Sequence, residues 1–273
     1  MVESSSEGGG RRGAFVTGAT RKAGIAAAVA RALAQDGWDV ATSGWRPSDA
    51  SEPWGSRPEE AEELVEELRG LGVRAAFREE DLRDADAAER LVAWAEVEIG
   101  PLGALVVAHT HSGLGGVLDT DVAEWDRHLE VNARGAFGLC AAFARRWSGV
   151  PGSGRIVVHT SRPPLAGEVA YAASKGALEW LVLSLGAELA PRGITVNAVD
   201  PGPTDTGWLD QSPDLRERLL KEHPLGRLGR PEDSASLVAY LCSAQGGWVN
   251  GQVLACDGGF GTLRTGRRGR ELF

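Results

Sequence analysis

Tyr171 and Lys175 lie four residues apart at the start of a long apolar segment, residues 170–190. In a helix this spacing places both side chains on one face, one turn apart. A tyrosine with an unperturbed pKa of about 10 is a poor base at neutral pH, but an adjacent ammonium stabilises the phenolate and lowers that pKa. The pair could therefore exchange a proton with a substrate hydroxyl or carbonyl. The structural alternative is a half-buried ring beside a solvated lysine.

The elements that would position this pair follow a regular rhythm. Short apolar runs predict seven strands, at residues 14–16, 39–43, 73–77, 104–108, 155–158, 194–199 and 252–255. Helical patterns lie between them, at residues 25–35, 58–69, 86–99, 122–147, 170–190, 214–222 and 231–243. This alternation predicts an α/β fold, a doubly wound parallel sheet covered by helices on both faces. Such a sheet binds ligands beyond the carboxyl ends of its strands.

Composition sets limits on size, partners and compartment. The chain has 273 residues, 42% of them hydrophobic, which suits one large domain over residues 13–260 between a disordered tail, 1–12, and a basic tail, 261–273. The net charge of -9 disfavours nucleic acid and anionic membranes as partners. Three scattered cysteines indicate buried thiols in a reducing, cytoplasmic compartment. We expect no signal peptide and no membrane span.

A glycine-bearing turn follows the first predicted strand. Gly18 and Gly24 lie in the segment of residues 17–26, immediately before a helix. Glycines let the backbone approach a pyrophosphate, and a helix N-terminus offers unpaired N–H groups and the positive end of its dipole. The spacing departs from G-x-G-x-x-G, and an ordinary turn between strand and helix is the alternative.

Taken together, these features resemble the short-chain dehydrogenase/reductase family over roughly residues 13–260, which implies a single Rossmann-type domain. Within the family, the run of residues 193–206 is most similar to the 3-oxoacyl-[acyl-carrier-protein] reductase group. The residues that carry the resemblance are Thr17, Gly18, Gly24, Ile25, Asp81, Leu82, Asn132, Ser161, Tyr171, Lys175, Pro201, Gly202, Asp257, Gly258 and Gly259.

The resemblance implies a role for each member of a catalytic group. Tyr171 would protonate the carbonyl oxygen as hydride arrives, and Ser161 would hold that oxygen by a hydrogen bond. Lys175 would bind the nicotinamide ribose and lower the pKa of the tyrosine, and Asn132 would hold a water that links the lysine to solvent. A strand-end serine and a helical asparagine that satisfies the backbone are the structural alternatives.

Charge near the second strand predicts the cofactor. The strand ends at Ser43 and continues into Gly44, Trp45 and Arg46, with no acid to accept from a ribose 2′-OH. The cations Arg21, Lys22 and Arg46 would favour the 2′-phosphate of NADP(H) over NAD(H), unless they are merely solvated. Asp81 would face the adenine, and the turn at Pro201 would cap the nicotinamide. The remaining expected cofactor contacts are Thr17, Gly18, Thr20, Gly24, Ile25, Leu82, Ala108, His109, Tyr171, Lys175, Gly202, Thr204 and Thr206.

Two departures from the family pattern distinguish this chain. After the fourth strand it reads Val107-Ala108-His109-Thr110-His111, where the family has Asn-Asn-Ala-Gly or Asn-Ala-Gly. Ser161 and Tyr171 are ten residues apart, against about thirteen in the family, so residues 162–164 should turn more tightly. These departures motivate an alternative, a non-redox enzyme on the same scaffold that performs a cyclisation, dehydration or epimerisation.

Three histidines follow neighbouring predicted strands. His109 and His111 come after the fourth strand and His159 near the end of the fifth, so their rings could converge near Ser161. Such a group could supply an acid or base with a pKa of about 6.5, or ligands for a metal. We favour the other interpretation, a packing role, and expect no metal.

Substrate and partners follow from the segment after the sixth strand. Residues 203–224 should form a lid, either over an apolar ketone or packed on its own domain. His111, Arg162 and Trp208 are the candidate substrate contacts, for a small-molecule or carrier-bound carbonyl. Arg145, Arg146 and Arg162, or the arginines of the basic tail, would attract an acidic carrier.

By resemblance the helices at residues 122–147 and 170–190 would form the interface of a homodimer or homotetramer. A nucleotide sensor without turnover is a third class, which the retained catalytic group argues against.

Overall fold

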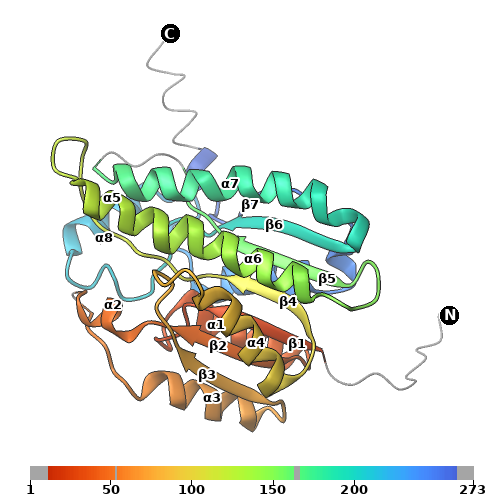
Figure 1. Ribbon diagram of the computed structural model, residues 1–273. Helices are drawn as coiled ribbons and strands as arrows, with labels where there is room; N and C mark the ends of the chain where they lie inside the picture. The colour runs from red at the N-terminus through yellow and green to blue at the C-terminus, as the bar shows by residue number, and fades with distance from the viewer. Residues whose placement is uncertain (1–11, 53, 163–166, 263–273) are drawn as a thin grey trace.

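Seven parallel strands form one sheet in the computed structural model, which describes residues 12–52, 54–162 and 167–262. Their order is β3-β2-β1-β4-β5-β6-β7, so the doubly wound sheet predicted from the sequence is confirmed (Figure 1). Every predicted strand is present, with bounds shifted by at most two residues. The strands are β1 (Gly13–Thr17), β2 (Asp39–Gly44), β3 (Ala75–Glu79), β4 (Leu102–Val107), β5 (Gly154–His159), β6 (Ile194–Asp200) and β7 (Val253–Ala255).

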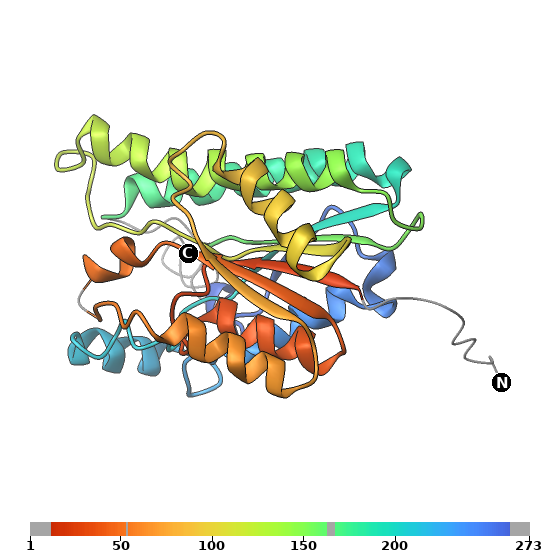
Figure 2. The ribbon, with the colours of Figure 1, turned by 60° about the horizontal axis from the view of Figure 1, so that its bottom comes forward.

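Helices cover both faces of the sheet (Figure 2). One layer contains α4 (Ala87–Ile99), α6 (Gly135–Arg146) and α7 (Val169–Leu189), and the other contains α1 (Ile25–Gln35), α3 (Glu60–Gly70) and α9 (Pro231–Cys242). Short turns of 3-10 helix follow α7 (η2, Ala190–Arg192) and α9 (η3, Gln245–Trp248).

Alternation within each strand divides the apolar side chains between two cores. In β1, Phe15 belongs to the core under α4, α6 and α7, whereas Ala14 and Val16 belong to the core under α1, α3 and α9. All three are fully buried because side chains of a parallel sheet point alternately to its two covered faces. Burial on both faces explains why these strands are continuous apolar runs.

The helix predicted over residues 122–147 is divided into three parts. The α-helix α5 (Val122–His128) leads into a π-helical segment, η1 (Leu129–Arg134), and then into α6. The structure also contains α2 (Arg46–Ala50), which none of the predicted helices covers. The apolar pattern of a long helix looks the same when one turn is widened to a π-helix, so it does not predict η1. A five-residue helix such as α2 is too short to show a helical period at all.

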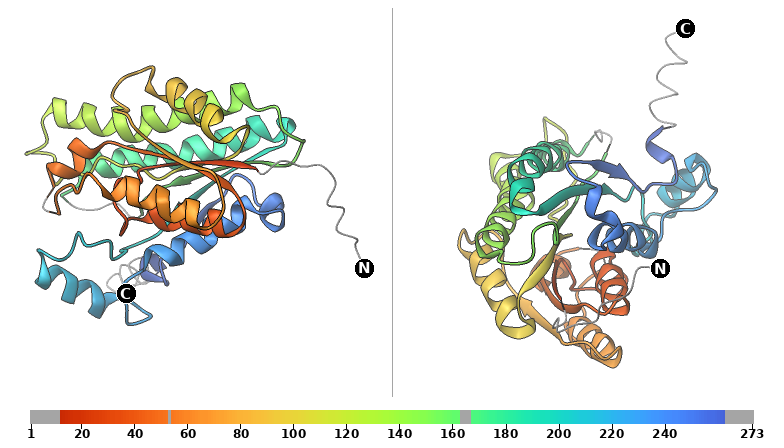
Figure 3. Two further views of the ribbon diagram at one scale, coloured as in Figure 1. Left: turned by 90° about the horizontal axis from the view of Figure 1, so that it is seen from below. Right: turned by 90° about the vertical axis from the view of Figure 1, so that its right-hand side faces the viewer.

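The carboxyl ends of the strands meet at one end of the molecule. Three short helices gather there, α2, α5 and α8 (Pro213–Glu222), as Figure 3 shows from below. The chain reverses its direction of winding between β1 and β4, and this switch point is where doubly wound sheets bind ligands.

Three expectations, about the tails, membrane spans and the cysteines, have different outcomes. The tails predicted at residues 1–12 and 261–273 lie almost wholly outside the described residues. Within the described part of the chain, no helix combines the length and the apolar character needed to cross a membrane. Of the cysteines, Cys140 and Cys242 are buried, whereas Cys256 is only half-buried.

Candidate active site

Tyr171 and Lys175 occupy the first two turns of α7, on the helix face that their spacing predicts. Lys175 is buried, with 3% of its surface exposed, and its Nζ lies 5.7 Å from the centroid of the Tyr171 ring. The same Nζ donates a hydrogen bond of 3.1 Å to the backbone oxygen of His159, the last residue of β5. The pair is therefore attached to the carboxyl end of the sheet.

Burial determines the protonation of this pair. It raises the pKa of Tyr171 to about 12 and lowers the pKa of Lys175 to about 8. The net pKa shift of Tyr171 is therefore opposite to the lowering expected beside Lys175, because loss of hydration dominates and the carboxylates of Glu168 and Asp200 also disfavour a phenolate. At neutral pH Tyr171 carries its proton and can act as a proton donor.

Ser161 and Thr110 bring hydroxyl groups to Tyr171 from two neighbouring strands. Ser161 lies two residues beyond β5 and Thr110 three residues beyond β4, and hydrogen bonds from both lower the tyrosine pKa against the effect of burial. Thr160 anchors the same loop, since its Oγ1 donates to the backbone oxygen of Lys175 at 3.0 Å. The sequence singled out Ser161 but not Thr110, which only the pairing of β4 with β5 brings to the site.

Asn132 joins the loop after β4 to α7. Its Oδ1 accepts from the backbone N–H of His111 at 2.7 Å, and its Nδ2 donates to the backbone oxygen of His111 and to Oγ of Ser174, each at 2.9 Å. Asn132 is 1% exposed and lies within η1, where the wider turn belongs to a class that is common at functional sites. The water that the resemblance places on Asn132 stays a prediction.

His109 replaces the small residue of the family pattern and is held on both sides of its ring. Nε2 lies 3.0 Å from the backbone oxygen of Val131, and Nδ1 lies 2.8 Å from Oγ1 of Thr17. A carbonyl can only accept, so Nε2 carries the proton and Nδ1 accepts from Thr17, whose oxygen in turn accepts from the backbone N–H of Ala108. Burial lowers the pKa of His109 to about 4. The ring is neutral and packs β1 against β4.

The three histidines expected near Ser161 do not converge. His159 turns towards the sheet face covered by α9, where its Nε2 lies 3.0 Å from Oγ of Ser234. His111 turns towards α5, where its Nε2 lies 2.8 Å from Oε1 of Glu124. The rings diverge because alternate positions along a strand and its following loop face different layers. The buried, hydrogen-bonded His159 matches the packing role that we favoured. His111 instead meets His128, which the sequence did not single out.

The turn after β1 has the form expected for a phosphate-binding loop. Gly18 has φ of +87°, and a Cβ there would lie 2.8 Å from the backbone nitrogen of His109, so only glycine fits. Among the described residues no side chain caps the start of α1 after Gly24, and its first turn, beginning at Ile25, holds no acid. The open N–H groups and the helix dipole therefore fit the pyrophosphate of a dinucleotide.

The cations expected to receive a 2′-phosphate already have acidic partners. Arg46, which follows Trp45 at the start of α2, donates to Glu79 at 2.6 Å and also to Glu62. Lys22 lies 3.2 Å from Glu63 on α3. A phosphate at Arg46 would therefore have to compete with Glu79, an effect that the sequence of β2 alone could not show.

Other expected cofactor contacts take part in local structure. Thr20 donates to Asp49 of α2, and Asp81 pairs with Arg83 at 2.6 Å while Leu82 is buried beside it. The Nη2 of Arg21 donates to the backbone oxygen of Thr206 at 2.7 Å. Arg21 thus links the loop after β1 to the segment after β6.

The turn after β6 is built around Asp200. Its Oδ1 accepts from the backbone N–H of Gly202, the residue after Pro201, at 3.0 Å. Thr204 is buried and donates to the backbone oxygens of Pro201 and Gly202, each at 3.2 Å. Burial raises the pKa of Asp200 to about 6, and its charge in turn opposes the lowering of the Lys175 pKa. The sequence-based predictions did not include Asp200, although its position directly before the Pro201 turn could have identified it as a site residue.

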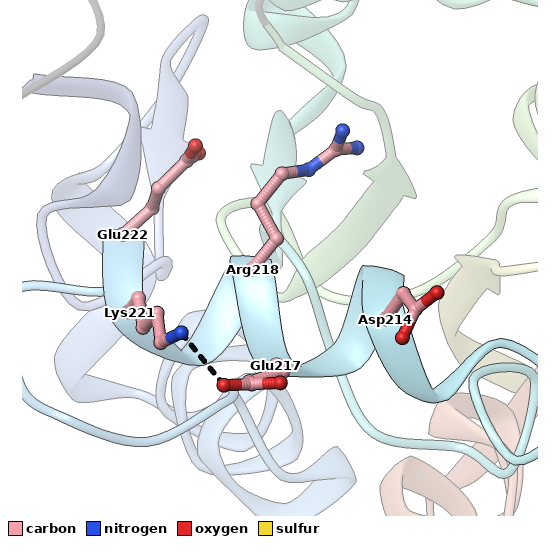
Figure 4. A pocket seen from close by; sticks show the side chains of 5 residues that line it. All are labelled: Asp214, Glu217, Arg218, Lys221 and Glu222. Carbon is pink, nitrogen blue, oxygen red and sulfur yellow. Dashed lines mark ion pairs between the residues drawn. The ribbon is translucent and has the colours of Figure 1, made fainter.

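The lid expected over residues 203–224 contains α8 and carries a small core of its own. Leu209 and Leu219 are buried against Leu228 and Phe260, so the apolar side of the segment packs on its own domain. Trp208 donates its Nε1 hydrogen to the backbone oxygen of Thr204 at 2.8 Å. The outer face of α8 carries a shallow charged hollow, shown in Figure 4, that includes no member of the catalytic group.

The arginines expected to attract a substrate or carrier are paired within the domain. Arg162 makes two hydrogen bonds of 2.6 Å to Glu179 on α7. Arg146 donates to Glu96 at 2.6 Å, and Arg145 lies 3.6 Å from Glu89 on α4. The tight turn expected after Arg162 falls on residues 163–166, outside the described residues, and so does most of the basic tail.

Known proteins share both the sequence and the fold. Residues 18–261 match the family described as enoyl-(acyl carrier protein) reductase. The chain is 38% identical to an uncharacterized oxidoreductase, YjdA, of Bacillus subtilis (90% of this chain, 96% of the relative), and 32% identical to 3-oxoacyl-[acyl-carrier-protein] reductase FabG of Staphylococcus aureus (91% and 97%).

Solved structures with a similar fold belong to the same family. A short-chain dehydrogenase of Burkholderia cenocepacia in complex with NADP superposes with a TM-score of 0.81 at 35% identity, over 92% of this chain and 97% of that one. The parallel sheet, the glycine turn, the half-buried tyrosine and the buried lysine are thus accompanied by similarity along nearly the whole chain. This protein belongs to the short-chain dehydrogenase/reductase family of oxidoreductases, which use a nicotinamide cofactor.

Proposed function

We propose that the protein is an NADP(H)-dependent reductase that converts a ketone to an alcohol. The observation that carries the proposal is the protonated, half-buried Tyr171, with hydroxyl groups of Ser161 and Thr110 and the amine of Lys175 around it. A neutral phenol at the carboxyl end of the sheet suits the donation of a proton to a carbonyl oxygen.

Each residue of the group has a separate task in this reaction. The bound cofactor supplies the hydride to the carbonyl carbon. Tyr171 gives its phenolic proton to the carbonyl oxygen, and Ser161 holds that oxygen through its hydroxyl. The phenolate that remains is stabilised by the Lys175 ammonium, whose Nζ is 5.7 Å from the ring centroid. Asn132 keeps the loop after β4 in place by its hydrogen bonds to His111.

His109 offers no support for a non-redox reaction on this scaffold. One of the two departures behind that alternative was a new imidazole beside the cofactor site, yet both ring nitrogens of His109 have partners. The other departure, the short loop after Ser161, falls largely outside the described residues. Its pKa of about 4 leaves it neutral, so it has neither a free lone pair nor a titratable proton for catalysis near pH 7. A packing role for His109 is consistent with reductase activity.

The choice of NADP(H) is supported by Arg46 and by the NADP in the structure from Burkholderia cenocepacia. Arg46 is the first residue of α2, next to the end of β2, where a ribose 2′-phosphate would lie. Binding would replace the contact of Arg46 with Glu79 by a stronger, doubly charged partner. Titration of NADPH and NADH into wild type and Arg46→Ala tests this directly. Equal affinity for the two cofactors in wild type would contradict the preference.

The substrate we propose is a 3-oxoacyl compound, free or carrier-bound, or a related natural-product ketone. The support is the 32% identity to FabG of Staphylococcus aureus. Loss of NADPH absorbance with a panel of ketones, including 3-oxoacyl thioesters, measures the activity. Product formation without any change in the nicotinamide would contradict a reductase and support the non-redox alternative.

We further propose that two copies associate through α6 and α7. Large apolar side chains are exposed there, Phe137 by 51%, Trp180 by 74% and Leu183 by 42%. Apolar side chains gathered on one helical face are typical of protein interfaces. Trp180→Glu should convert a dimer or tetramer to a smaller species in light scattering, with Tyr240→Glu, at an exposed tyrosine of α9, as the control. A wild-type monomer would contradict the proposal.

A further inference from the structure

His111, Glu124 and His128 form a cluster that the proposed reaction does not use. One ring nitrogen of each histidine and one carboxylate oxygen of Glu124 lie within 4.8 Å of one another. Glu124 and His128 come from successive turns of α5, and His111 comes from the loop after β4. The two imidazole rings meet edge to face with their centroids 4.5 Å apart. We propose that this cluster binds a divalent transition-metal ion of the Zn²⁺ class.

The ligand set and its spacing suit such an ion. Two imidazoles and one carboxylate are a known protein ligand set for Zn²⁺, with a fourth position left for water or another ligand. Neighbouring ligand atoms in a tetrahedral zinc site lie roughly 3.3 Å apart, given metal–ligand distances of about 2.0–2.1 Å. In this structure Oε1 of Glu124 is 2.8 Å from Nε2 of His111 and 3.3 Å from Nδ1 of His128. An ion therefore requires only a small separation of existing contacts.

His128 presents Nδ1 to the cluster. Its ring is 1% exposed, and Nδ1 lies 2.9 Å from the backbone oxygen of Glu124 as well as 3.3 Å from Oε1. An ion bound at Nδ1 would replace the contact with the backbone oxygen and would leave the proton of the neutral ring on Nε2. Nε2 is buried and has no hydrogen-bond partner among the described residues.

The surroundings hold the carboxylate and leave space beside it. Arg127 donates to Oε2 of Glu124 at 2.6 Å, so Oε1 alone faces the two histidines. Asp121 caps α5 by accepting from the backbone N–H of Glu124 at 2.7 Å. Opposite them lies Gly113, where a Cβ would come within 2.7 Å of Oε1. The side chains of His111 and Glu124 are 18% and 27% exposed, which gives an ion access from solvent.

The ion would lie next to the catalytic group without belonging to it. The ring of His128 is 6.4 Å from the ring of Tyr171 between centroids, and the backbone of His111 is held by Asn132. Metal binding can be measured on the protein alone, with neither cofactor nor substrate. Its failure would therefore leave the proposed reductase activity untouched.

The experiment is metal titration of the untagged, full-length chain. We expect one Zn²⁺ per chain by calorimetry, and a visible absorption spectrum of tetrahedral type when Co²⁺ is used instead. His111→Ala and Glu124→Gln should each weaken binding by more than about 100-fold, since loss of an outer partner alone costs about 10- to 100-fold. Glu130→Gln, which removes the same charge one turn beyond the cluster, should bind as wild type does.

Two results would overturn the proposal. One is wild-type protein that binds neither Zn²⁺ nor Co²⁺ at concentrations comparable to its own. The other is binding that is equally tight in wild type, His111→Ala and Glu124→Gln, which would place the ion elsewhere. Both substitutions are at partly exposed side chains, and circular dichroism checks that each variant is folded. Anomalous diffraction from zinc-soaked wild-type crystals locates the ion independently of any variant.

Discussion

Two helices at the carboxyl end of the sheet each carry a polar pair with four-residue spacing, and the two pairs behave differently. In α7, the Nζ of Lys175 lies 5.7 Å from the centroid of the Tyr171 ring and donates to the backbone of β5. In α5, Nδ1 of His128 lies 3.3 Å from the Glu124 carboxylate, which also contacts His111. Spacing decides which side chains share a helix face, but the elements packed against that face decide what the side chains bind.

The difference is also one of electrostatic compensation. Among the described residues neither Tyr171 nor Lys175 forms an ion pair, and burial is the main cause that moves the tyrosine pKa up to about 12 and the lysine pKa down to about 8. The carboxylate of Glu124 has both histidines and the Arg127 guanidinium around it. Uncompensated buried groups are characteristic of proton transfer, whereas compensated groups are characteristic of structure or of ion binding.

The largest expected effect is the loss of turnover in Tyr171→Phe. Removal of the proton donor should lower kcat by about 10²- to 10⁴-fold, the usual contribution of a general acid, because the ring and its packing remain. Glu124→Gln should change kcat far less, since the α5 pair takes no part in proton transfer. NADPH oxidation with a ketone substrate measures both. A similar loss in the two variants would show that the functional distinction between α7 and α5 is wrong.

Low pH should lower the stability of the folded protein through the buried side chain of His159. Burial lowers the pKa of His159 to about 4, so between pH 6.5 and pH 4 the unfolded chain binds a proton that the folded chain does not. The free energy of unfolding should therefore fall as pH falls through this window, by up to about 3 kcal/mol from His159. Urea unfolding at pH 7 and pH 4.5 measures the change.

The matched variant for the acid prediction is His159→Gln, whose side chain can still reach Ser234 but does not titrate. Its free energy of unfolding should depend less steeply on pH over the same window. If wild type and His159→Gln lost the same stability on acidification, the contribution of His159 would be refuted.

Turnover should fall as pH rises above about 8. The Lys175 ammonium, which has a pKa of about 8, must be charged to stabilise the Tyr171 phenolate, while Tyr171 itself stays protonated up to about pH 12. We expect kcat to fall by about tenfold per pH unit well above this value. A kcat that stays constant to pH 10 would show that the lysine charge is not required in this direction.

The smallest expected effect concerns how each helix begins. The Asp121 side chain caps α5, whereas none of the described side chains caps α7 after Glu168. Asp121→Ala should lower the free energy of unfolding by about 1 kcal/mol, the usual value of a helix cap. Asp126→Ala, at an exposed position within α5, is the control and should change stability less. Equal losses in urea unfolding would show that the cap does not hold α5.

The sequence by itself determined the order of strands and helices, the glycine turn before α1, and the face of α7 that carries Tyr171 and Lys175. These features depend on local periodicity, on the conformational freedom of glycine and on four-residue spacing, all of which are written along the chain. The catalytic roles of Asn132 and Ser161 came from the resemblance to a family and stay proposals. Periodicity failed at the π-helical segment η1, which looks like any other part of a long helix.

Only the tertiary structure decided the partners of the polar side chains. It turned His109 into a packing residue between Thr17 and Val131, directed His159 to Ser234, and joined His111 to Glu124 and His128. It also reversed the expected direction of the Tyr171 pKa shift, because the burial of a phenol depends on segments that are distant in the sequence. Partners and desolvation both arise from packing between separate elements, and no local pattern contains them.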